Sequence, residues 1–228
     1  LKSIKANKNI FIEKPLCLNI KQLDKIEKSI KKDKILMVGF NRRFSPFIKD
    51  LKSKLDKISQ PKAFIYTCNA GQIDKHHWIQ NPKIGGGRLI GEACHFIDLL
   101  RFLSGAKIIN LDIIQANDEK QYSDTFSLNI KFEDGSIGTI HYFANGSKFF
   151  PKERLEVFTA NTIFRIDNYM RIQSWGKHAI KNKISFKQKK GHYECAKAFL
   201  DSINFKKSTP IPLNEILEIH KWIFNLKQ

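Results

Sequence analysis

The chain has 228 residues, 42% of them hydrophobic, so it can bury a substantial core as one large domain or two smaller ones. It contains no apolar run near the roughly 20 residues that a transmembrane helix needs, and its first residues lack a signal-peptide core. The four cysteines are widely spaced and form no CxxC pair, so we expect reduced thiols, a soluble cytoplasmic protein and no membrane partner.

The formal net charge of +18 raises the hypothesis of nucleic-acid binding, because basic residues that neutralise phosphates drive such binding. The distribution of the basic residues indicates instead that they mainly solvate the surface, since only seven of the 40 are arginines and the lysines are spread from end to end. The densest cluster is expected to be a polar hairpin and contains Lys177, Lys181, Lys183, Lys187, Lys189 and Lys190. Nucleic-acid binding through lysines is the less favoured alternative, and no nucleic-acid partner is expected.

Residues 9–14 form a short apolar run without polar alternation, which is typical of a strand covered on both faces of a parallel sheet. Pro15 ends it, because the residue before a proline is held extended. We therefore expect Lys14 at the carboxyl end of the strand, where open α/β sheets bind their ligands.

Asn19 and Gln22 form a capping-box start for a helix that should end near residues 32–33. Residues 35–40 are a second buried strand, followed by Arg42 and Arg43 on the same rim as Lys14. A helix from about residue 46 to residue 57 comes next. The β-α-β order predicts the last part of a doubly wound parallel sheet.

From residue 61 onward strand patterns dominate and alternate, which predicts an antiparallel sheet with one face open to solvent or to an interface. The expected strands are 62–69, 107–116, 126–132, 137–144, 153–159, 162–167, 170–175 and 183–187. The chain ends in helices at about 193–204 and 214–226. The fold class is therefore α/β (α+β), with a small parallel sheet followed by a large, mostly antiparallel sheet covered by helices.

Three glycines at residues 85–87 run into a segment that predicts a helix from about Glu92 to Ser104. The segment is apolar nearly all round and should be buried against the sheet. At about 100° per residue, Glu92, His95 and Asp98 fall within a roughly 120° arc. These polar groups need partners or a cleft, because burying them unpaired costs several kcal/mol, about 2 to 7 each.

The Glu13-Lys14-Pro15 motif, the Gly-Phe-Asn-Arg-Arg-Phe motif at 39–44, and the glycines leading to His95 and Asp98 resemble those of the Gfo/Idh/MocA oxidoreductases. The resemblance covers essentially the whole chain. It implies the carboxyl-terminal part of a Rossmann nucleotide-binding domain over residues 1–60 and a substrate and oligomerisation domain over residues 61–228. The last helices of the second domain can pack back on the first domain. It also implies activity on sugars, nucleotide sugars or cyclitols.

The resemblance carries two catalytic roles to this chain: Lys14 lies near the nicotinamide and the reacting hydroxyl, and His95 carries the proton. These residue types suit the chemistry, because removal of a hydride from a carbinol leaves a proton that an imidazole can take. Lys14 can also polarise the oxygen. Glu13, Lys14, Pro15 and Arg42 are the expected cofactor contacts.

Asp98, Arg43, Glu92 and Trp78 are the expected substrate contacts. Asp98 would hold a substrate hydroxyl or orient its helix. Many family members have an aspartate four residues before the histidine, where this chain has Gly91, and we expect Glu92 to take over that role.

Several residues admit a second interpretation. Arg42 and Arg43 can pair with surface acids, and Trp78 is more simply a packed core residue. Cys94 beside His95, or with His76 and His77, is a weak case for a thiol nucleophile or a metal site, since the spacing fits no metal motif. No metal is expected.

No G-x-G-x-x-G turn occurs in the chain, and we expect the main turn that binds the phosphates of NAD or NADP to lie upstream of Leu1. The first hypothesis is thus part of an NAD(P)-dependent oxidoreductase, inactive alone and forming a homo-oligomer through its antiparallel sheet. The alternative is a non-catalytic binding or assembly module with the same fold.

Overall fold

The computed structural model describes residues 1–31, 33–74, 76–81, 83–116 and 124–226, which form two compact units. The first unit consists of Leu1–Phe44, Trp78–Asp98 and Gly191–Gln228, and the second of Ser45–His77 and Leu99–Lys190. Over the described part of the chain, no helix is both long enough and apolar enough to cross a membrane. The predicted division after residue 60 stays a prediction.

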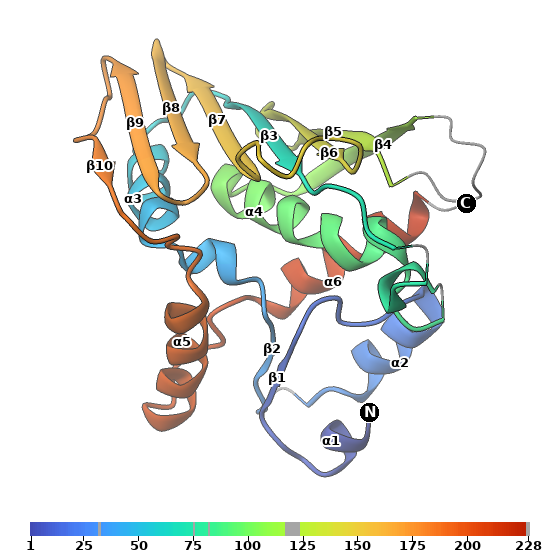
Figure 1. The fold of residues 1–228 in the computed structure, drawn as a ribbon. Coiled ribbons are helices and arrows are strands. Elements are labelled where there is room, and N and C mark those ends of the chain that lie inside the picture. The colour runs from blue at the N-terminus through green and yellow to red at the C-terminus, as the bar shows by residue number, and fades with distance from the viewer. Residues whose placement is uncertain (32, 75, 82, 117–123, 227–228) are drawn as a thin grey trace. The chain divides into compact units, whose positions relative to one another are not determined.

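The first unit is built around two parallel strands, β1 (Ile10–Ile12) and β2 (Leu36–Val38), joined by helix α2 (Ile20–Ser29) (Figure 1). Its other elements are α1 (Lys2–Lys5), a 3₁₀ turn at Asn41–Phe44, a 3₁₀ turn at Trp78–Gln80, a π-helical turn at Leu89–Ala93, the start of α4 (Cys94–Ser104), α5 (His192–Asn204) and α6 (Leu213–Asn225). Helix α6 packs against α2, β2 and the π-helical turn. The predicted β-α-β unit is confirmed.

The predicted Asn19 cap of α2 is present, although the returning bond of Gln22 goes to Leu18 instead of Asn19. The side chain of Asn19 accepts a hydrogen bond from the Gln22 backbone N–H at 3.0 Å, and the Gln22 side chain accepts one from Leu18 N at 2.9 Å. The helix ends at Ser29, earlier than the sequence pattern indicated, and residue 32, where it was expected to end, lies outside the described residues.

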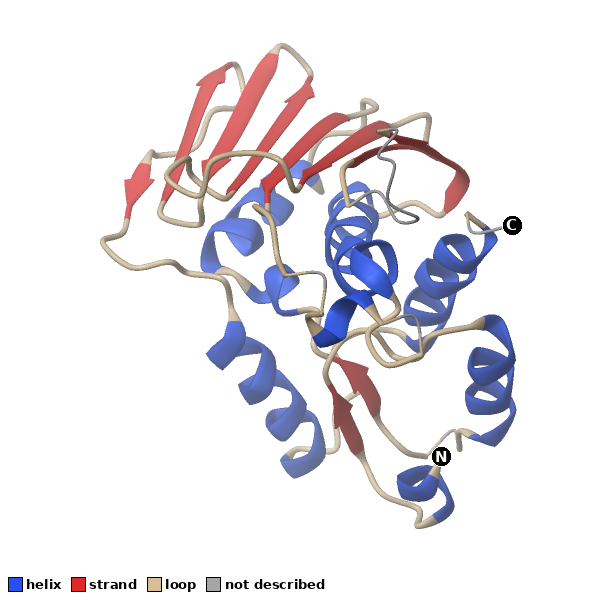
Figure 2. Ribbon diagram, turned by 45° about the vertical axis from the view of Figure 1, so that its right-hand side comes forward, coloured by secondary structure: helices blue, strands red, loops and turns tan. Residues whose placement is uncertain are grey.

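The second unit contains one sheet of eight strands in the order β10-β9-β8-β7-β3-β6-β5-β4 (Figures 1 and 2). The strands are β3 (Ala63–Asn69), β4 (Ile108–Gln115), β5 (Phe126–Phe132), β6 (Ile137–Phe143), β7 (Glu153–Thr159), β8 (Thr162–Asp167), β9 (Arg171–Gly176) and β10 (Lys183–Ile184). All neighbouring pairs are antiparallel except β3 and β6, which run parallel. The predicted mixed fold class, with a small parallel sheet and a large, mostly antiparallel one, is confirmed.

One face of this sheet is the core of the second unit. Alternate residues of β5 are buried, as the sequence predicted: Phe126, Leu128, Ile130 and Phe132. Helix α3 (Pro46–Leu55) and the last turns of α4 lie on that face (Figure 1). Gly138 of β6 makes room for α4, because a Cβ there would come within 2.9 Å of Leu100 Cδ1.

Candidate functional site

Lys14 lies just beyond the carboxyl end of β1 and reaches the π-helical turn. Its ammonium donates hydrogen bonds to Glu92 Oε1 at 2.6 Å and to the backbone carbonyl of Gly91 at 2.7 Å. The side chains of Lys14 and Glu92 are 17% and 23% exposed, so the ion pair is shielded but still reachable from solvent. Such charge-assisted bonds fix the direction of a flexible lysine.

Close backbone packing forms the turn that presents Glu92. A Cβ on Gly85 would lie 2.3 Å from the Cα of Ile79, and Gly86 and Gly87 have φ angles of +73° and +78°, which favour glycine. A Cβ at Gly91 would approach the carbonyl oxygen of Gly85 to 3.2 Å. A side chain at residue 91 would be tightly packed against this carbonyl, and the carboxylate of the turn is that of Glu92.

The prediction of a single helix from Glu92 to Ser104 is wrong at its start. Residues Leu89–Ala93 form a π-helical turn, and the α-helix begins at Cys94. The hydrogen-bond spacing changes from i→i+5 to i→i+4 between Glu92 and His95, so regular α-helical spacing does not apply across these residues. Glu92 binds Lys14, whereas Asp98 binds Arg43, so the two acids serve different partners.

His95 lies in the first turn of α4 and is 5% exposed. Its ring meets the edge of Phe40 with centroids 5.9 Å apart. Phe40 follows β2, so His95 and Lys14 are each held next to the end of one of the two parallel strands.

Arg43 joins three elements of the first unit through a buried ion-pair network. Its Nε and Nη2 donate to the two carboxylate oxygens of Asp98, both at 2.7 Å, and its Nη1 donates to Glu215 Oε2 at 2.6 Å. Burial lowers the pKa of the Arg43 guanidinium, but the carboxylates of Asp98 and Glu215 outweigh it and leave that pKa raised. The network links the 3₁₀ turn, α4 and α6, and a substrate contact for Arg43 or Asp98 stays a prediction.

The remaining predicted residues lie in varied surroundings. Arg42 is 7% exposed, and its guanidinium lies 5.1 Å from the centroid of the Phe96 ring. The Glu13 carboxylate lies against Gly39, where a Cβ would come within 3.0 Å of Glu13 Oε2. Pro15 follows Lys14 through a cis peptide bond. Trp78 is 59% exposed, which overturns the interpretation of a packed core tryptophan.

The thiol interpretation of Cys94 finds no support. Burial raises the pKa of the Cys94 thiol to about 12, because it outweighs the opposing effect of the nearby Lys14 ammonium. Among the described residues, no group of three His, Cys, Asp or Glu side chains is arranged to hold a metal ion.

Residues 57–164 match the family described as GFO/IDH/MocA C-terminal domain. Over 177 residues the chain is 29% identical to the myo-inositol 2-dehydrogenase of Thermotoga maritima, covering 72% of this chain and 51% of that protein. Over 149 residues it is 29% identical to the scyllo-inositol 2-dehydrogenase (NAD(+)) of Bacillus subtilis, covering 61% of this chain and 43% of that one.

The matched segment, residues 57–164, is similar to the Gfo/Idh/MocA C-terminal domain. The resemblance inferred from the sequence is thereby confirmed. Solved structures agree on the fold: an aldose-aldose oxidoreductase from Caulobacter crescentus, complexed with glycerol, has a TM-score of 0.83 at 16% identity and covers 99% of this chain and 71% of its own. A UDP-N-acetylglucosamine 3-dehydrogenase from Acidithiobacillus ferrooxidans has a TM-score of 0.79 at 14% identity, with the same two coverages.

The chain spans about half the length of the first two curated relatives. The segment that matches the Gfo/Idh/MocA C-terminal domain contains Glu92, His95 and Asp98, whereas Lys14 and Arg43 precede it. The candidate site therefore combines residues inside and outside the matched domain, all of them within the first compact unit.

Two residues of α6 contact the candidate site residues or their neighbours in the chain, although the sequence did not single them out. Glu215 binds Arg43, and His220 Nε2 accepts a hydrogen bond from the Leu16 backbone N–H at 3.0 Å. The one available signal was a histidine at an inward position of an otherwise apolar helix stripe, which by itself indicates only a buried histidine.

Proposed function

We propose that this chain is part of an NAD(P)-dependent oxidoreductase that moves a hydride between a nicotinamide cofactor and a hydroxyl or keto group of a sugar, nucleotide sugar or cyclitol. The observation that carries the proposal is the Lys14 ammonium fixed at the end of β1 by Glu92 and the Gly91 carbonyl. The inositol dehydrogenases among the relatives make cyclitols the first substrates to test.

The hydrogen-bond capacity of Lys14 supports this role. An ammonium has three N–H donors, and the described residues occupy two of them. The third is left for the oxygen of an alcohol or ketone, where the positive charge stabilises developing negative charge. Because the other two bonds hold the ammonium in place, it needs little reorganisation when that charge develops.

His95 is the proposed carrier of the hydroxyl proton. An imidazole can accept a proton near neutral pH, as oxidation of a carbinol requires. The contact with Phe40 holds the ring, and His95 lies at the start of α4, directly after the π-helical turn that carries Glu92. The Glu92 carboxylate pairs with Lys14 at 2.6 Å, and we interpret this contact as Glu92 taking over the role of the family aspartate.

The residues present suit the nicotinamide end of a cofactor. A cationic side chain and a glycine, Gly39, lie at the carboxyl ends of two adjacent parallel strands, the edge at which such sheets bind nucleotides. When bound, the nicotinamide supplies or accepts the hydride. No phosphate-binding glycine motif occurs in this sequence, so these residues account for contacts near the reacting carbon and not for the choice between NAD and NADP.

Activity is best measured as nicotinamide absorbance with a panel of inositols, aldoses and nucleotide sugars, using the chain and a version extended by its upstream codons. We expect Lys14→Met and His95→Ala each to lower kcat by about 10²- to 10⁴-fold. Lys221→Gln is the matched control, because Lys221 also pairs with a glutamate, Glu27 at 2.9 Å, but on the exposed surface. An unchanged kcat in Lys14→Met would contradict the proposed mechanism.

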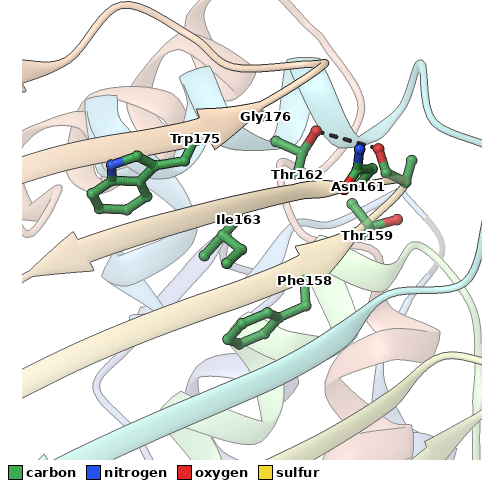
Figure 3. A pocket seen from close by; sticks show the side chains of 8 residues that line it. Phe158, Thr159, Asn161, Thr162, Ile163, Trp175 and Gly176 are labelled. Atoms are coloured by element: carbon green, nitrogen blue, oxygen red, sulfur yellow. Dashed lines mark hydrogen bonds between the residues drawn. The ribbon is translucent and has the colours of Figure 1, made fainter.

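A second candidate is a binding or assembly module, favoured by an apolar row on the open face of the large sheet. Strand register places side by side Trp175, Ile163, Phe158, Ala63 and Ile137, from five strands. Four are at least 37% exposed. Figure 3 shows the first three on the same side of their strands, lining a shallow pocket of about 500 Å³.

Exposed apolar rows of this kind are typical of interaction surfaces. We propose that this row contributes to a homo-oligomer. Such assembly is compatible with the redox role, and it is the main function if experiments exclude the redox role. Failure of the extended chain to bind any nicotinamide cofactor, together with self-association in sedimentation experiments, would favour the assembly module alone.

A further inference from the structure

His220 of α6 is fully buried and makes two directed hydrogen bonds. Its Nε2 accepts from the Leu16 backbone N–H at 3.0 Å, and its Nδ1 lies 2.7 Å from the carbonyl of Ile216 one turn earlier. Since a backbone N–H can only donate and a carbonyl can only accept, both bonds form together only when the proton is on Nδ1. One neutral tautomer therefore satisfies both partners.

The Leu16 N–H lies in the segment that carries Lys14. Leu16 is 5% exposed and belongs to no strand or helix, so neither a ladder nor a helical turn provides an acceptor for its N–H. A buried donor without a partner is unfavourable. His220 supplies the acceptor two residues beyond Lys14, and this ties the lysine's backbone to α6.

The same helix also reaches the side of the site that carries His95. Glu215, in the first turn of α6, binds Arg43, which binds both oxygens of Asp98 on α4. In addition, the Phe40 ring lies 6.1 Å from His220 and 5.9 Å from His95, between centroids.

We propose that His220 is a positioning residue for Lys14, holding the segment after β1 so that the ammonium stays on Glu92 and the Gly91 carbonyl. The inference rests on the proposed redox role of Lys14 for its effect on activity, but not for its effect on geometry. His220 itself touches no reacting group, because it acts through Leu16. Loss of its acceptor lets the Lys14 segment shift, and a displacement of about 1 Å can lower a rate by as much as roughly 100-fold.

The test compares His220→Leu with His220→Gln, because glutamine can place an oxygen acceptor near the position of Nε2 and leucine cannot. Ile223→Val is the control, since Ile223 is fully buried in the same helix and lies outside the hydrogen-bond chain. Three quantities are measured on each protein: hydrogen exchange of the Leu16 amide, the rate of Lys14 acylation read by mass spectrometry, and kcat and KM of the extended chain.

We expect His220→Leu to speed Leu16 exchange about three- to tenfold, the effect of one hydrogen bond. Lys14 acylation should also become faster, and kcat should fall about tenfold or more with a smaller change in KM. His220→Gln should restore all three, and Ile223→Val should alter none. Unchanged Lys14 acylation in His220→Leu, or an equal change in Ile223→Val, would overturn the inference.

The redox proposal can fail separately. If the unsubstituted extended chain reduces no nicotinamide with any substrate, the proposed function is lost. Acylation of Lys14 still decides whether His220 positions that side chain. If His220→Leu does not fold, His220→Gln against the unsubstituted protein decides: retained Leu16 protection and slow Lys14 acylation support the inference, and unprotected Leu16 with unchanged Lys14 acylation contradicts it.

Discussion

Substitution of Asp98 by asparagine tests the buried network that joins α4 to α6. Asp98 is fully buried, and it accepts two charge-assisted hydrogen bonds from Arg43, whose side chain is 4% exposed. Asparagine keeps the shape but removes the charge, so the buried guanidinium loses the carboxylate of Asp98 and keeps that of Glu215. Breaking a buried pair in this way costs about 3–5 kcal/mol.

For a chain of this size, each kcal/mol corresponds to roughly 2–4 °C in Tm, so Asp98→Asn should lower Tm by about 6–20 °C. Thermal unfolding followed by circular dichroism at constant pH measures this. The double variant Asp98→Leu with Arg43→Met should recover part of the loss, because it removes both charges of the buried pair, while Glu215, with its side chain 18% exposed, loses the Arg43 partner but keeps some contact with solvent.

Lys221→Gln is the surface control for this experiment. Its ion pair with Glu27 is 44% and 40% exposed, and such pairs contribute less than about 1 kcal/mol. If Asp98→Asn lowers the free energy of unfolding by less than about 1 kcal/mol, or if the double variant is less stable than either single variant, the buried Arg43–Asp98 ion pair does not stabilise the fold as described.

Three further outcomes are expected. Burial lowers the pKa of His220 from 6.5 to about 4, so the unfolded chain binds its proton more tightly, and stability should fall by roughly 3 kcal/mol as the pH drops from 7 to 4. In His220→Gln, urea unfolding over that range should lack this contribution. Because burial raises the pKa of Cys17, Cys94 and Cys195 to about 12, iodoacetamide should label them in urea but not in the native chain at pH 8. Trp175→Glu should reduce self-association in analytical ultracentrifugation without changing Tm by more than a few degrees, and unchanged association would exclude the apolar row as an interface.

Much of the fold was predictable from the sequence because its local patterns are strong. The bounds of β5, β7 and β8 match the expected strands residue for residue, since their side chains alternate between the buried and the open face of one sheet. The Asn19 cap was found for a similar reason, because capping depends on residues three apart.

The candidate site was predictable in part. Motif positions identified Lys14 and Glu92, and the two side chains do meet. The way they meet was not predictable, because the π-helical turn depends on the packing of Gly85 against Ile79 and of Gly91 against the Gly85 carbonyl. Such contacts leave no periodic signal in the sequence.

The sequence by itself determined the order of strands and helices, the alternation of buried and open positions, and the residue types able to carry alcohol and ketone redox chemistry. Only the tertiary structure decided the parallel pairing of β3 with β6 and the roles of Glu215 and His220. The physical reason is separation along the chain. Arg43 and Glu215, like Leu16 and His220, are far apart in sequence and meet only because α6 packs against β2 and the π-helical turn.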